Sequence, residues 1–121
     1  MKFIYISIPI NTPGYDIEKQ RRKASKWQRY FEQQGYTVIN PFELAEQLRK
    51  SYMLITGNEP TYNQYLHEDL MNVEDCQEIF LCEGWTESYG CMEEVDHSIK
   101  HGLIFRFESK ERAKKIYGTI H

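Results

Sequence analysis

Residues 2–8, KFIYISI, place the strongest constraint on the fold, because nearly every side chain in the segment is apolar and most are β-branched or aromatic. A strand with one solvated face alternates apolar and polar residues. Continuous apolarity is instead typical of a strand buried on both faces of a parallel sheet. Pro9, Pro13 and Gly14 then mark a loop. The segment therefore predicts a central strand of an α/β sheet.

The rest of the chain alternates between helix-like and strand-like segments. Helices are predicted over 16–34, from 41 to about 50, over 62–74 and over 89–101. Strands are predicted over 37–40, 78–82 and 103–107, with 51–60 irregular and 111–118 a last helical turn or two. This alternation predicts a parallel sheet with helices on both faces. With the common strand order 2-1-3-4, a ligand would bind between strands 1 and 3, at loops 8–15 and 83–90.

Composition narrows the class of protein. The 121 residues suit one domain, expected over 1–121. Fifteen basic and 18 acidic residues, net charge -3, are spread along the chain and argue against a partner that is a nucleic acid. No apolar run approaches the roughly 18 residues that span a membrane, and no cleavage site follows the apolar start. Three cysteines, Cys76, Cys82 and Cys91, are expected to be free core thiols of a cytoplasmic protein.

Asp69 is the most informative single position. It lies seven residues after Tyr62, three after Leu66 and four before Val73, in the middle of the apolar face of the helix predicted over 62–74. A carboxylate there is unfavourable unless it is paired or used. Two interpretations stay open: a buried aspartate that caps a loop or pairs with an arginine, and a functional carboxylate.

Other candidates are weaker when taken alone. Glu94 lies at the margin of a helix face that we expect to be buried and to contain Cys91, Met92, Val95 and Ile99. It is also in the first turn of that helix, where glutamates are common without a function. Tyr5 and Ser7 point to the same side of the first strand, although most strand tyrosines are core residues. Ser88 and Gly90 open the last long helix, where a serine either caps the helix or helps to bind an anion.

Metal and cofactor motifs are not evident. His97 and His101 are four residues apart on one predicted helix, with Cys91 near them in sequence, but no third ligand has a suitable spacing. The chain contains no GxGxxG, P-loop or nucleophile-elbow motif. We therefore expect no metal site and no cofactor.

Two stretches, IYISIPI and DLMNVEDCQEIFLCEGWTESYGCMEEVDHSIKHGL, resemble the nucleoside 2-deoxyribosyltransferase-like superfamily, in particular its DUF4406 branch. That branch reads YISGPITG at the start and GW followed by S-x-G-x-x-x-E later. The likeness covers most of the chain and is weakest over 43–62 and the C-terminal tail. It implies a flavodoxin- or Rossmann-like three-layer sandwich with a parallel sheet of four or five strands. The chain departs from the pattern at Ile8, Gln77 and Glu93, where the family has glycine, aspartate and an apolar residue.

The resemblance also implies a function, cleavage of the N-glycosidic bond of a deoxynucleoside or its 5'-monophosphate. Glu94 corresponds to the nucleophile, Asp69 to an assisting acid and Tyr5 to the tyrosine that contacts the nucleophile. Ser88 occupies a position that favours a phosphorylated substrate. The residues expected to contact substrate are Ser7, Ile10, Asn11, Trp85, Ser88 and Gly90. Relatives build their pockets at subunit contacts, so a homodimer or higher homo-oligomer is expected. The alternative function is a catalytically silent nucleotide-binding domain.

Overall fold

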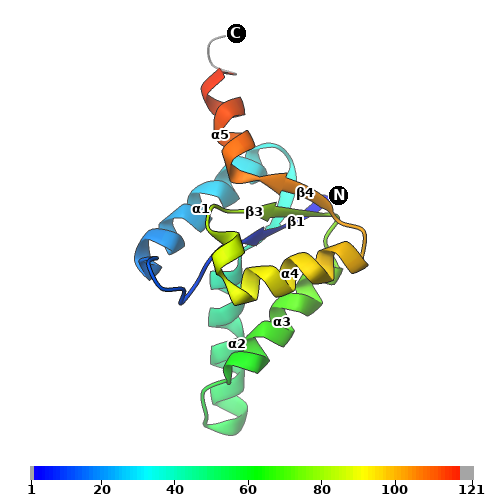
Figure 1. The fold of residues 1–121 in the computed structure, drawn as a ribbon. Coiled ribbons are helices and arrows are strands. Elements are labelled where there is room, and N and C mark those ends of the chain that lie inside the picture. Colours follow the sequence, from blue (N-terminus) through cyan, green and yellow to red (C-terminus); the bar gives the residue numbers. More distant parts are fainter. Residues whose placement is uncertain (1, 118–121) are drawn as a thin grey trace.

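A computed structural model describes residues 2–117 and shows one parallel sheet between helices (Figure 1). Its strands are β1 (Lys2–Ser7), β2 (Tyr36–Ile39), β3 (Glu78–Leu81) and β4 (Ile104–Phe107). Their order is β2-β1-β3-β4, and every pairing is parallel. The predicted parallel α/β class, strand order and adjacency of the first and third strands are confirmed. Residues 1 and 118–121 of the predicted domain lie outside the described residues.

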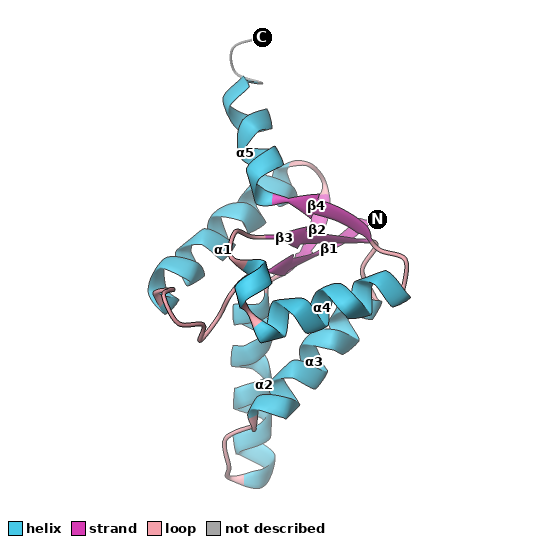
Figure 2. Cartoon of the chain, viewed as in Figure 1, coloured by secondary structure: helices cyan, strands magenta, loops and turns pink. Residues whose placement is uncertain are grey.

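The helices are α1 (Ile17–Gln33), α2 (Pro41–Thr56), α3 (Tyr62–Glu74), α4 (Tyr89–Lys100) and α5 (Glu108–Tyr117). A short 3₁₀ turn, η1 (Trp85–Glu87), precedes α4. In Figure 2, α1 lies on one side of the sheet, and α3 and α4 lie on the other. Parallel pairing requires each connection to return along the sheet, so the N-termini of α1 and α4 follow the carboxyl ends of β1 and β3.

The two faces of β1 belong to two separate hydrophobic cores. Ile4 and Ile6 pack with the α1 side chains Trp27 and Phe31. Tyr5 points to the opposite face and packs with side chains from α3 and β3. This alternation is the two-residue period of a strand, and it turns Ser7 to the same side as Tyr5. The central strand therefore presents two hydroxyl groups to the layer formed by α3 and α4.

Two predicted segments differ from the structure. Residues 51–56, expected to be irregular, continue α2 to Thr56, where Gly57 ends the helix with a positive φ of 75°. The apolar pattern is lost there because α2 extends beyond the sheet (Figure 1), which leaves Leu54 88% and Ile55 81% exposed. The last helical segment is also longer than predicted and begins at Glu108, while residue 118 lies outside the described residues.

The three cysteines are buried and free, as predicted. Among the described residues, no helix is long and apolar enough to cross a membrane.

A buried carboxylate joins α5 to the rest of the fold. Glu108 is 1% exposed and accepts hydrogen bonds from the Glu83 backbone N–H at 2.8 Å, Trp27 Nε1 at 2.9 Å and Lys23 Nζ at 3.2 Å. Arg112 pairs with its second oxygen at 2.8 Å. Burial on its own raises the pKa of this carboxyl, but the donors from Glu83, Trp27 and Lys23 outweigh burial and lower it.

Glu108→Gln should lower the free energy of unfolding by about 1.5–3 kcal/mol at pH 7, because it removes the charge that the donors stabilise. A lowered native pKa gives stability that is present above the unfolded value, about 4.3, and lost as the pH falls through the native value. The difference in unfolding free energy between Glu108→Gln and the wild type should therefore become smaller below about pH 4. Urea unfolding of both proteins at pH 7 and below pH 4 measures this difference. Glu46→Gln, in an exposed pair with Lys50, is the control and should cost less than about 0.5 kcal/mol.

Candidate active site

The carboxylate of Glu94 is held by two hydroxyl groups from the central strand. Tyr5 Oη donates to Oε2 at 2.6 Å, and Ser7 Oγ donates to Oε1 at 2.7 Å. Glu94 is only 5% exposed, so these bonds replace the water that a carboxylate otherwise requires. Each oxygen keeps a further lone pair, and the side chain is fixed in one position.

The buried face of α4 differs from the predicted one. Cys91, Glu94 and Ser98 are buried, whereas Met92 is 44% and Ile99 64% exposed. The prediction was wrong because it counted apolar residues only. The hydroxyls of β1 compensate the buried carboxylate, and the Ser98 hydroxyl donates to the Glu94 carbonyl at 2.7 Å. Glu94 therefore lies at the centre of the buried face and not at its margin.

The start of α4 positions Glu94 from the other side. Ser88 is the N-cap, and its hydroxyl accepts from the Cys91 backbone N–H at 3.3 Å. The hydroxyl of Ser88 is therefore engaged in capping, which was one of its two predicted roles. Glu94 lies in the second turn of α4 and not, as predicted, in the first turn, so the field of the helix N-terminus contributes little to its ionisation.

Asp69 of α3 lies beside Glu94 in the same cavity. Burial raises the pKa of Glu94 to about 7, against the opposing hydrogen bonds from Tyr5 and Ser7. Burial and then the charge of Glu94 raise the pKa of Asp69 to about 8. Among the ion pairs of residues 2–117, none joins Asp69 to an arginine, so the paired-aspartate interpretation is not what the structure shows. The two carboxyls titrate as an interacting pair.

The cavity has a volume of about 600 Å³ and opens at the carboxyl ends of the strands. Several of the predicted residues line it: Ile10, Asn11, Asp69, Ser88, Gly90 and Glu94. Tyr5 and Ser7 reach it through their hydrogen bonds to Glu94. Trp85 lies elsewhere and packs against Phe107, with ring centroids 6.4 Å apart. The face of α3 that carries Asp69 is divided, since Tyr62 and Leu66 line the cavity while Val73 is in the core.

Some lining residues were missed by the sequence analysis. Arg21 of α1 lines the cavity with its guanidinium 4.8 Å from the Phe42 ring centroid. Arg49 lines it from α2, where Glu59 accepts two hydrogen bonds from Arg49 Nε at 3.0 Å. The charge pattern of each helix resembles that of a solvated surface, and the length of α2 was underestimated. Only the topology brings the two cations to one cavity.

The departures from the family pattern fall in different places. Ile8 is a core residue that also lines the cavity. Gln77 lies at the other end of the strands, where its Oε1 accepts from the Phe3 backbone N–H at 2.7 Å. This difference therefore affects strand pairing and lies away from the carboxylates.

Comparison with known families shows which family the chain belongs to. The model of the family described as a domain of unknown function, DUF4406, matches residues 2–106. The chain belongs to the DUF4406 family. Neither the curated proteins nor the solved structures give a significant match. The DUF4406 match contains Tyr5, Asp69 and Glu94, whereas the link to nucleoside deoxyribosyltransferases rests on the motif resemblance.

The raised carboxyl pKa values predict a pH-dependent stability. The native state holds protons that the unfolded chain releases near pH 4, so stability falls as pH rises through about 7–8. Between pH 5.5 and 8.5, the free energy of unfolding should fall by up to roughly 5 kcal/mol, because each retained proton contributes about 1.4 kcal/mol per pH unit until its native pKa is reached. Glu94→Gln should remove the share of this fall that belongs to Glu94, roughly 2 kcal/mol, and the neighbouring Glu93→Gln should preserve the whole fall. Equal falls in wild type and Glu94→Gln, measured by urea unfolding, would contradict this interpretation of the pair.

Proposed function

We propose that this DUF4406 protein cleaves the N-glycosidic bond of a deoxynucleoside or its 5'-monophosphate, with Glu94 as the nucleophile. The observation that carries the proposal is the position of the Glu94 carboxylate. It is fixed by Tyr5 and Ser7 beside a cavity of about 600 Å³ that also contains Asp69. A fixed carboxylate next to a second carboxyl group is the arrangement that glycosyl transfer through a covalent intermediate requires.

In the first step, a Glu94 oxygen attacks the anomeric carbon, and the bond from that carbon to the base nitrogen breaks. Protonated Asp69 gives its proton to the departing base, so the products are a deoxyribosyl ester of Glu94 and the neutral base. In the second step, the Asp69 carboxylate takes a proton from water or from a second base, which attacks the ester carbon and releases Glu94. Water gives a hydrolase, and a second base gives a transferase.

The electrostatics of the pair suit these two roles. Burial raises the pKa of both carboxyls, so the pair holds a proton near neutral pH, and the hydroxyl donors Tyr5 and Ser7 favour the ionised form of Glu94. Near neutral pH, a population therefore has an ionised nucleophile and a protonated acid, which supports a bell-shaped pH–rate profile. Tyr5 and Ser7 hold the nucleophile in one orientation, which reduces the entropy that must be lost on attack.

The lining of the cavity supports a nucleotide-sized substrate. Its volume falls within the usual range for small-molecule sites, roughly 300–1,000 Å³. Phe42, Tyr65 and Leu66 offer apolar surface for a base, and Arg21 and Arg49 offer positive charge for a 5'-phosphate. The homo-oligomer implied by the resemblance stays a prediction. The exposed Leu54 and Ile55 at the end of α2 are apolar surface that a second copy would cover.

A second candidate function is a nucleotide-binding domain that does not turn over its ligand. Two observations favour it: both Glu94 oxygens already accept a hydrogen bond, and burial keeps this carboxyl partly protonated near neutral pH. Both properties weaken a nucleophile. This alternative predicts nucleotide binding without release of free base.

The test measures free base by chromatography after incubation with a panel of deoxynucleosides and their 5'-monophosphates. Glu94→Gln should reduce base release by about 10³-fold or more while retaining binding, because the amide keeps the shape but cannot form the ester. Asp69→Asn should reduce release less, because Asp69 assists the reaction. Glu93→Gln, one position earlier on α4, should change it only modestly.

Wild-type base release by Glu94→Gln would exclude Glu94 as the nucleophile. Binding of a nucleotide by the wild type with no release across the whole panel would instead establish the silent-binding alternative.

A further inference from the structure

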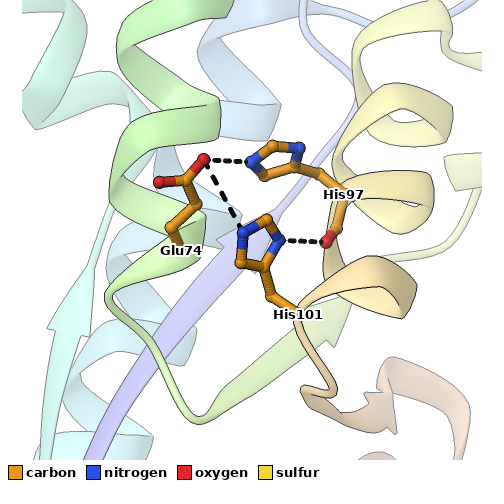
Figure 3. Close-up of side chains that lie close together, drawn as sticks. All are labelled: Glu74, His97 and His101. Carbon is orange, nitrogen blue, oxygen red and sulfur yellow. Dashed lines mark hydrogen bonds and ion pairs between the residues drawn. The ribbon is translucent and has the colours of Figure 1, made fainter.

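Three side chains meet at the end of α3 and α4 that lies away from the cavity. Glu74 is the last residue of α3, and His97 and His101 are one turn apart at the C-terminal end of α4 (Figure 3). Glu74 Oε1 is 2.7 Å from His97 Nε2 and 3.8 Å from His101 Nε2. One ligand atom from each residue lies within 4.8 Å of the other two. The third partner that the spacing of the histidines does not provide therefore comes from a different helix.

The orientation of His101 is informative. Its Nδ1 lies 3.0 Å from the His97 backbone carbonyl. A carbonyl oxygen only accepts, so Nδ1 carries a proton, and Nε2 is the ring nitrogen that faces the Glu74 carboxylate. A metal ion placed between this nitrogen and the carboxylate would contact both. An imidazole whose far nitrogen donates to a backbone carbonyl is also the usual arrangement of a metal-binding histidine.

We propose that Glu74, His97 and His101 bind one divalent transition-metal ion, for which Zn²⁺ is the reference. Two imidazole nitrogens and a carboxylate oxygen suit Zn²⁺ and its neighbours better than Mg²⁺ or Ca²⁺, which prefer oxygen ligands. Metal–ligand distances of about 2.0–2.2 Å place tetrahedral ligands about 3.3 Å apart. The observed 2.7 Å and 3.8 Å bracket that separation, and all three ligand atoms lie within 4.8 Å of one another, so small movements of the side chains would bring them to one ion.

The surroundings of the site indicate its role. The side chains of Glu74, His97 and His101 are 43%, 22% and 39% exposed, so an ion can enter and water can fill the fourth position. The ion ties the last turn of α3 to the last turns of α4. These are the helices that carry Asp69 and Glu94, five and three residues before the site. We therefore assign the ion a structural role, stabilising the packing of the two helices, separate from the chemistry of the cavity.

The test uses the 121-residue chain without an affinity tag, after removal of metal with a chelator, at pH 7.5. Titration with Co²⁺, followed by visible absorption, should show one bound metal ion per chain. Competition for Zn²⁺ with a chromophoric chelator should give the same stoichiometry. Zn²⁺ at about 100 μM should raise the thermal midpoint, because an ion that binds only the native state stabilises it. None of these readouts involves base release, so the result stands apart from that of the proposed enzyme activity.

Matched variants locate the ion. The double variant H97Q/H101Q should bind no metal ion at this site and should show no rise in thermal midpoint with Zn²⁺. Glu74→Gln should bind Zn²⁺ roughly 10-fold or more weakly than the wild type. His67→Gln removes an exposed histidine of α3 outside the cluster and should behave like the wild type. Circular dichroism of each variant without metal checks that it is folded, and Glu74→Gln keeps the test decisive if the double variant is not.

Two outcomes overturn the proposal. The first is wild-type affinity and stoichiometry in folded Glu74→Gln and H97Q/H101Q. The second is the absence of bound Zn²⁺ in the wild type at about 100 μM Zn²⁺, which would show that the three side chains only interact with one another.

Discussion

The burial of the Glu94 carboxylate beneath the central strand is the interaction on which the rest of the structure depends. A buried carboxylate is unfavourable by several kcal/mol unless its oxygens are hydrogen-bonded. The β2-β1-β3-β4 order satisfies this requirement because it places β1 beside β3, and α4 follows β3 after the short turn η1. Tyr5 and Ser7, two residues apart on β1, therefore meet both oxygens of a residue 87 to 89 positions later in the chain.

Those hydroxyls donate hydrogen bonds to the Glu94 carboxylate but bring no positive charge to it. This distinguishes Glu94 from Glu108, another buried acid. Glu108 is paired with Lys23 and Arg112, and its pKa is lowered. Glu94 has hydroxyl donors and a second acid, Asp69, beside it, and the pKa values of both are raised. One acidic group therefore stabilises the fold at neutral pH, whereas the pair lowers stability there and retains protons that can be transferred. Such divergence among buried acids is typical of functional sites.

The sequence predicted the features that follow from regular periodicity. Continuous apolarity identified β1 as central, the two-residue period placed Tyr5 and Ser7 on one face, and a carboxylate in an apolar stripe singled out Asp69. The buried face of α4 could not be predicted, because Glu94 and Ser98 are polar and are buried only through long-range hydrogen bonds. The extent of α2 and the meeting of Glu74 with His97 and His101 depend on tertiary packing in the same way. Local patterns thus specify elements, while the partners of polar residues come from topology.

The central claim, that Glu94 is a nucleophile, predicts a covalent intermediate. The most direct measurement is an acid quench during turnover of a deoxynucleoside 5'-monophosphate, followed by peptide mass analysis. A deoxyribosyl phosphate ester on the peptide that contains Glu94, absent from Glu94→Gln, is the predicted result. Base release during the same incubation without any adduct on that peptide, or with the adduct on Asp69, would contradict the claim.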